Sequence, residues 1–128
     1  MYLRNVGIFV KDLEGAKAFF EKYFDAKLLK EINNPEKNYY SYVMVLNESG
    51  MIELMCKPET VDLGQDPNRL GIAHICITVD SREQLDTIID GFKKDGYKIQ
   101  YEPSKPEGPG EVPAVTFEGI VMEVNYGF

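Results

Sequence analysis

The stretch Asn5-Val-Gly-Ile-Phe-Val10 returns later in the chain as His74-Ile-Cys-Ile-Thr-Val79, with the same alternation of residue types. A second match aligns Met51-Ile-Glu53-Leu with Val121-Met-Glu123-Val. In both matches the second copy lies about 70 residues after the first. Internal repetition at one offset is typical of a duplicated structural unit. The sequence therefore predicts one domain of 128 residues built from two modules, about 1–56 and about 70–128.

The same order of elements surrounds both matches. In the first half, a strand over 3–10 precedes a helix capped by Asp12, and strands are predicted over 26–32, 39–46 and 51–55. In the second half, a strand over 71–79 precedes a helix that begins at the capping box Ser81-Arg-Glu-Gln84 and ends at Gly96. Strands over 97–101, 114–117 and 120–126 follow, with 103–113 as a Pro- and Gly-rich loop. Each half is therefore β-α-β-β-β, and the fold class is α+β.

Composition narrows the range of partners. The formal net charge is -7 at pH 7, whereas nucleic acid and anionic membranes are bound mainly through clustered Lys and Arg. We therefore expect a small molecule or another protein as the partner, and neither nucleic acid nor a membrane. The chain shows no long apolar run and no signal-peptide pattern, and its two cysteines lack metal or redox spacing. These features predict a cytoplasmic protein.

Alternation along the strands places four polar residues on one type of face. In the first strand Val6, Ile8 and Val10 face one way, so Asn5 faces the other. By the same alternation, three more polar residues face away from the apolar residues next to them in their strands; these residues are Glu53, His74 and Glu123. A pseudo-twofold arrangement of two modules would bring equivalent positions together. A divalent cation would offset two carboxylates in apolar strands, and this N/O ligand set suits Ni, Zn, Co, Mn or Fe(II).

These four positions resemble the metal-ligand positions of the glyoxalase/bleomycin-resistance/dioxygenase superfamily, the vicinal oxygen chelate proteins. In that family the ligands come from the first and last strands of each module, and glyoxalase I has His or Gln, Glu, His and Glu in order. This chain offers Asn5, Glu53, His74 and Glu123, so three of four positions agree and Asn5 departs. The resemblance implies a curved mixed sheet around a cavity, and a homodimer.

The resemblance also implies an activity. We expect a metal-dependent lyase or isomerase similar to lactoylglutathione lyase, which acts on a ketoaldehyde-thiol adduct, with Glu123 or Glu53 moving a proton between adjacent carbons. The alternative is a non-catalytic small-molecule or drug-binding protein of the bleomycin-resistance type. A third possibility is an interaction or regulatory domain that uses the acidic surface.

Each candidate residue also has a purely structural interpretation. A lone His in an apolar strand is commonly a hydrogen-bonded structural residue, and strand carboxylates commonly face solvent. Asn5 could bond the local backbone alone. The matched positions in the two modules favour the metal site.

Overall fold

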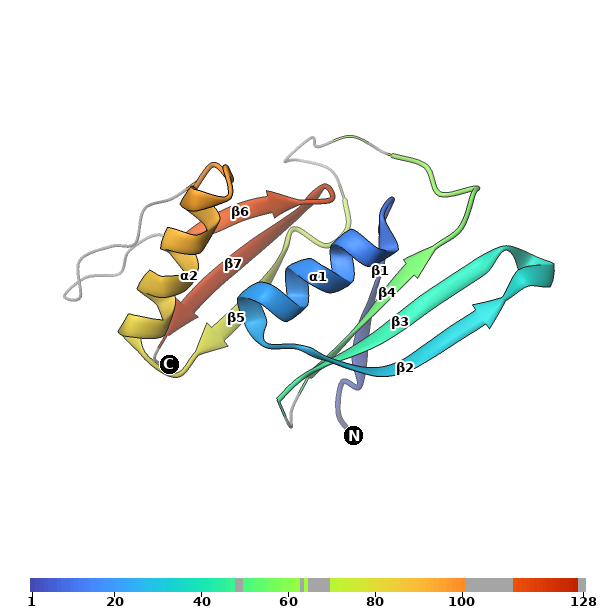
Figure 1. The fold of residues 1–128 in the computed structure, drawn as a ribbon, viewed down its shortest axis with the longest axis horizontal. Coiled ribbons are helices and arrows are strands. Elements are labelled where there is room, and N and C mark those ends of the chain that lie inside the picture. Colours follow the sequence, from blue (N-terminus) through green and yellow to red (C-terminus); the bar gives the residue numbers. More distant parts are fainter. Residues whose placement is uncertain (48–49, 63, 65–69, 101–111, 127–128) are drawn as a thin grey trace. The chain divides into compact units, whose positions relative to one another are not determined.

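The computed structural model describes residues 1–47, 50–62, 64, 70–100 and 112–126. The chain divides into two compact units, Met1–Asp62 and Leu63–Phe128. The described residues form two sheets, one in each unit, as expected for two modules that each contribute a sheet. Each unit also contains one α-helix, so the α+β class is confirmed (Figure 1).

Unit 1 contains a four-stranded mixed sheet in the order β1-β4-β3-β2. Its strands are β1 (Asn5–Phe9), β2 (Lys27–Asn34), β3 (Tyr39–Leu46) and β4 (Gly50–Cys56), with a short 3-10 helix at Pro35–Lys37 between β2 and β3. β1 runs parallel to β4, whereas β3 is antiparallel to both β4 and β2. The first and last strands of the unit are therefore neighbours, although they are far apart in sequence.

The helix of unit 1 is α1 (Leu13–Phe24), which packs on β3 and β4 (Figure 1). It begins where predicted, because the Asp12 side chain accepts a hydrogen bond from the backbone N–H of Gly15. One side of the helix is buried, and so are most of the strand positions predicted to face it, although Val6 is only partly buried. The buried residues are Ile8, Val10, Ala16, Phe19, Phe20, Tyr23, Ile52 and Leu54. The predicted alternation in β1 and β4 is confirmed.

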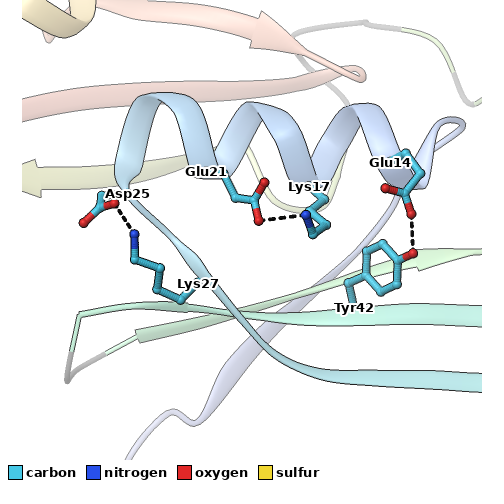
Figure 2. Close-up of polar contacts among 6 residues, drawn as sticks. All are labelled: Glu14, Lys17, Glu21, Asp25, Lys27 and Tyr42. Carbon is cyan, nitrogen blue, oxygen red and sulfur yellow. Dashed lines mark hydrogen bonds and ion pairs between the residues drawn. The ribbon is translucent and has the colours of Figure 1, made fainter.

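A polar contact joins the outer side of α1 to β3. In Figure 2, Tyr42 of β3 points toward Glu14 in the first turn of α1, and its hydroxyl donates a hydrogen bond to the Glu14 carboxylate. This bond, with a smaller contribution from burial, raises the pKa of Tyr42 to about 12. Lys17 and Glu21 form an ion pair on the helix, and Asp25, which caps its C-terminal end, pairs with Lys27 at the start of β2 (Figure 2). These exposed pairs contribute little to stability.

Unit 2 contains a three-stranded sheet in the order β5-β7-β6 and the helix α2 (Arg82–Lys94). The strands are β5 (His74–Val79), β6 (Ala114–Phe117) and β7 (Ile120–Tyr126); β5 is parallel to β7, and β6 is antiparallel to it. α2 packs on β5 and β7. The buried apolar positions of α2 are those predicted from the sequence: Leu85, Ile88, Ile89 and Phe92.

The predicted strand over 97–101 is wrong for residues 97–100, and residue 101 lies outside the described part of the chain. The N–H of Gly96, which has φ of 86°, bonds to the carbonyl of Lys93, and the N–H of Tyr97 bonds to that of Phe92. This pair of bonds is the Schellman ending of a helix, and the Phe92 and Tyr97 rings stack edge to face 5.6 Å apart. Tyr97 therefore belongs to the helix ending, and one bond from the N–H of Gln100 to the carbonyl of Ala114 follows.

The predicted start of α2 is confirmed in part. Ser81 caps α2, because its hydroxyl accepts a hydrogen bond from the backbone N–H of Gln84. In a capping box the Gln84 side chain would in turn accept from the backbone N–H of Ser81, but here it accepts from the N–H of Asp80. Residues 101–111, which include most of the predicted loop, lie outside the described residues. Within the part of the chain that the structure describes, neither helix is long and apolar enough to cross a membrane.

Candidate functional site

Asn5 and Glu53 form a pair on the sheet of unit 1. In the parallel register Asn5 lies opposite Met51 and Gly7 opposite Glu53, so Asn5 and Glu53 are diagonal neighbours on one face. The Asn5 amide Nδ2 lies 3.4 Å from Oε2 of Glu53. Both residues are partly exposed, whereas Ile52 and Leu54 on either side of Glu53 are buried. The structure therefore brings these two predicted site residues together.

Two hydroxyl groups of β3 bind the other oxygen of Glu53. The Tyr39 hydroxyl donates to Oε1 at 3.0 Å and the Ser41 hydroxyl donates to the same atom at 3.1 Å. Ser41 is 0% exposed and is the buried polar residue among those that the structure describes. The sequence interpretation placed neither Ser41 nor Tyr39 beside Glu53. The signal was available, because a serine inside the apolar run of β3 requires a hydrogen-bond partner on its own face.

His74 and Glu123 form the corresponding pair in unit 2. His74 lies opposite Val121 and Cys76 opposite Glu123, so His74 and Glu123 are also diagonal neighbours across parallel strands. His74 Nε2 lies 3.4 Å from Oε2 of Glu123. The His74 side chain is 49% exposed and that of Glu123 19% exposed, whereas Met122 and Val124 on either side of Glu123 are buried. An exposed imidazole beside a half-buried carboxylate is accessible to a ligand.

The two pairs occupy equivalent positions in their sheets. In unit 1 the first residue of β1, Asn5, is paired with the residue that lies two positions before Glu53 on β4. In unit 2 the first residue of β5, His74, is paired in the same way with the residue two positions before Glu123 on β7. This shared register agrees with the repeat seen in the sequence. Each unit therefore holds one carboxylate and one side chain with an amide or imidazole nitrogen at the same place.

The units differ in what holds the carboxylate. Val43 lies opposite Glu53, and two residues before it comes the hydroxyl donor Ser41. Ala114 lies opposite Glu123, and two residues before it comes the apolar Val112. Glu53 is thus bound by hydroxyls on β3, whereas the equivalent position next to Glu123 supplies none.

Burial and the two carboxylates change the acidity of neighbouring groups. Burial is the main cause that raises the pKa of Tyr39; a hydrogen bond with Ser41 lowers it, and the contact with Glu53 raises it further. Burial also raises the pKa of the Cys76 thiol, and the charge of Glu123 adds to this effect. Both groups are therefore held in their protonated, neutral forms at neutral pH.

The ligand types fit a divalent metal, but the described residues show two pairs of ligands. Imidazole nitrogen, carboxylate oxygen and amide oxygen suit borderline divalent ions. No group of three or more His, Cys, Asp or Glu able to hold a metal occurs among the described residues. Asn5 also turns its Nδ2 toward Glu53, and an amide binds metals through oxygen, so half a turn of the amide is required. That all four residues share one ion stays a prediction.

The chain contains two similar units, and each carries a pair of polar side chains on its first and last strands. This arrangement places it in a class of α+β proteins with paired modules. Residues 3–112 match the model of the Glyoxalase/Bleomycin resistance protein/Dioxygenase superfamily. Because the match spans most of the chain, the protein belongs to that superfamily. The predicted resemblance and fold are confirmed.

Individual proteins are also similar to this chain. The uncharacterized protein YwkD of Bacillus subtilis is 27% identical over 82% of this chain and 78% of its own length. A glyoxylase/bleomycin resistance protein/dioxygenase domain from Frankia is similar with a TM-score of 0.80, 22% identity, and coverage of 100% of this chain and 98% of that one.

Two solved structures are of characterised proteins. The trypanothione-dependent glyoxalase I of Leishmania major has a TM-score of 0.76 and 20% identity, over 97% of this chain and 85% of that one. A variant of the fosfomycin resistance protein FosX of Listeria monocytogenes, in complex with Mn(II) and a dihydroxypropylphosphonic acid, has a TM-score of 0.72 and 18% identity, over 98% and 92%. At these identities the likeness shows the fold alone.

Proposed function

We propose that this protein is a metal-dependent lyase or isomerase similar to glyoxalase I, acting on a ketoaldehyde-thiol adduct or a related vicinal-oxygen substrate. The observation that carries the proposal is the equivalent placement of Asn5 with Glu53 and of His74 with Glu123 on parallel strand pairs. Superfamily membership supports it. The metal, one of Ni, Zn, Co, Mn or Fe(II), would be held by these four side chains.

The chain's own residues divide the work in this proposal. When bound, the metal would supply Lewis-acid polarisation of the substrate's vicinal oxygens. Glu53, held by two hydroxyl donors, serves as a fixed ligand. Glu123 lacks the equivalent hydroxyl and lies beside His74, so its carboxylate is the better candidate to accept a proton from one carbon and return it to the next.

Metal content tests the proposal directly. The purified wild-type protein, Glu123→Gln and the control Glu83→Gln would be dialysed, loaded with Ni²⁺, Zn²⁺, Co²⁺ or Mn²⁺, and measured by elemental analysis. Glu83 is exposed in the first turn of α2, so its variant controls for the loss of one negative charge. We expect near-stoichiometric metal in the wild type and control, with loss in Glu123→Gln. No metal in any of the three would refute the proposal.

Activity is the second readout. Isomerisation of a methylglyoxal-thiol adduct by the loaded enzyme should fall by about 10²–10⁴-fold in Glu123→Gln, the range for removal of a general base. The Glu83→Gln control should keep the wild-type rate. If metal is absent and apolar small molecules bind tightly, the chain is instead a binding protein of the bleomycin-resistance type.

We also propose that the protein acts as a cytoplasmic homodimer. Among the described residues, several large apolar side chains are exposed, including Leu3, Leu29 and Leu70, and burial of such side chains favours an interface. Light scattering coupled to size exclusion would give twice the chain mass of 14.6 kDa if the proposal is correct. A mass of one chain at micromolar concentration would contradict it.

A further inference from the structure

The two oxygens of the Glu53 carboxylate have different surroundings. Oε1 accepts two hydroxyl hydrogen bonds, from Tyr39 at 3.0 Å and Ser41 at 3.1 Å. Oε2 has one long contact, to the Asn5 amide at 3.4 Å. A carboxylate oxygen offers about two lone-pair positions, so the two hydroxyls occupy Oε1. The remaining capacity to bind a cation is on Oε2.

We propose that Tyr39 and Ser41 are positioning residues that hold Glu53 so that Oε2 alone binds a divalent cation. The inference rests on the proposed function and goes beyond it, because neither residue is among the four proposed ligands. Tyr39, Ser41 and Glu53 lie on one sheet face of unit 1. Residues two apart on a strand share a face, so Tyr39, Ser41 and Val43 face the same way on β3, and Val43 is paired with Glu53 on β4. The arrangement is therefore built into the sheet itself.

The burial of Ser41 makes the arrangement rigid. Ser41 is 0% exposed, and the described residues give its hydroxyl Glu53 as acceptor. A Glu53 rotamer that withdrew Oε1 would leave this buried donor unsatisfied. Outer-sphere hydrogen bonds of this kind orient metal ligands, and their loss typically lowers metal affinity by about 10- to 100-fold.

Binding of Ni²⁺ or Mn²⁺ alone to the full chain tests the inference. Titration calorimetry would compare wild type with Tyr39→Phe and Ser41→Ala, using Tyr40→Phe as matched control. Tyr40 is the next residue of β3 and lies on the opposite sheet face, 40% exposed. We expect the dissociation constant to rise by about 10- to 100-fold in the first two variants and to stay unchanged in the control.

A spectroscopic readout separates positioning from general weakening of the fold. In metal-minus-apo infrared difference spectra, a carboxylate bound through one oxygen has a wider splitting between its antisymmetric and symmetric stretches than one bound through two. The wild type should show the wide splitting. Tyr39→Phe removes one of the two donors to Oε1, opens one lone-pair position on that oxygen and should narrow the splitting, whereas Tyr40→Phe should not. Far-UV circular dichroism would establish that each variant is folded, and the conservative Tyr39→Phe alone answers the question if Ser41→Ala unfolds.

The outcomes separate this inference from the proposed function. If the wild type binds metal and all variants bind equally well with the same splitting, the positioning role is refuted and the metal site stands. If the wild type binds no metal, both the proposed function and the positioning role are refuted. Weaker binding with narrowed splitting in Tyr39→Phe, against an unchanged control, supports the inference.

Discussion

Replacing Glu53 by alanine removes the acceptor that Tyr39 and Ser41 share. A fully buried hydroxyl left without a partner costs about 1–3 kcal/mol, and Ser41 is completely buried. Tyr39 is partly exposed and can turn to water, so its contribution is smaller. We therefore expect Glu53→Ala to lower the free energy of unfolding by about 2–4 kcal/mol.

Glu53→Gln is the informative partner of this variant. The glutamine carbonyl can still accept both hydroxyls, and the Asn5 amide can turn its oxygen toward the new NH₂ group, so every hydrogen bond is retained. We expect a change within about 1 kcal/mol, together with loss of metal affinity. Urea unfolding followed by far-UV circular dichroism, with unchanged m-values, would measure both variants.

A double-mutant cycle with Ser41→Ala tests the assigned cause. If the cost of Glu53→Ala comes from the orphaned hydroxyl, the same substitution in a Ser41→Ala background should cost less by about 1–3 kcal/mol. Additive effects of the two substitutions would refute this reasoning, since they would show that Ser41 and Glu53 are not energetically coupled.

Three further predictions concern other parts of the chain. Gly96→Ala should cost about 1–2 kcal/mol in thermal unfolding, because φ of 86° places an L-residue in the left-handed region; an unchanged melting temperature would contradict this. The hydrogen bond that raises the pKa of Tyr42 to about 12 favours the neutral phenol in the folded state. Its stabilising effect is complete below the unfolded pKa of about 10 and is lost as pH rises toward 12, so urea titrations should show wild type and Tyr42→Phe converging over this range. Burial and then the charge of Glu123 raise the pKa of Cys76; Glu123→Gln should therefore speed its reaction with a disulfide reagent at pH 8, and an equal or slower rate would contradict the assigned charge effect.

Residue alternation was sufficient to predict the faces of the site strands. Glu53 lies between the buried Ile52 and Leu54, and Glu123 between the buried Met122 and Val124, as expected from a period of two. The repeat also predicted that the two pairs of polar residues occupy equivalent places in their modules, because it aligned the first and last strands of both modules; the parallel register itself comes from the structure.

Sequence patterns were less informative where local hydrogen bonds compete with strand propensity. Tyr97 is a good strand residue, yet its N–H completes the ending of α2 and its ring packs on Phe92. The hydroxyls that bind Glu53 were missed because β3 was interpreted only by its apolar content. Three-dimensional register across β3 and β4 was needed to place Ser41 beside a carboxylate.

The parallel pairing of first and last strands also affects the order of folding. Asn5 and Glu53 are 48 residues apart in sequence, so their contact requires closure of a long loop across nearly the whole first unit. Such non-local contacts form late, after hairpins such as β3 with β4 have formed. A chain emerging from the ribosome therefore brings neither pair of proposed ligands together until the corresponding unit has been fully synthesised.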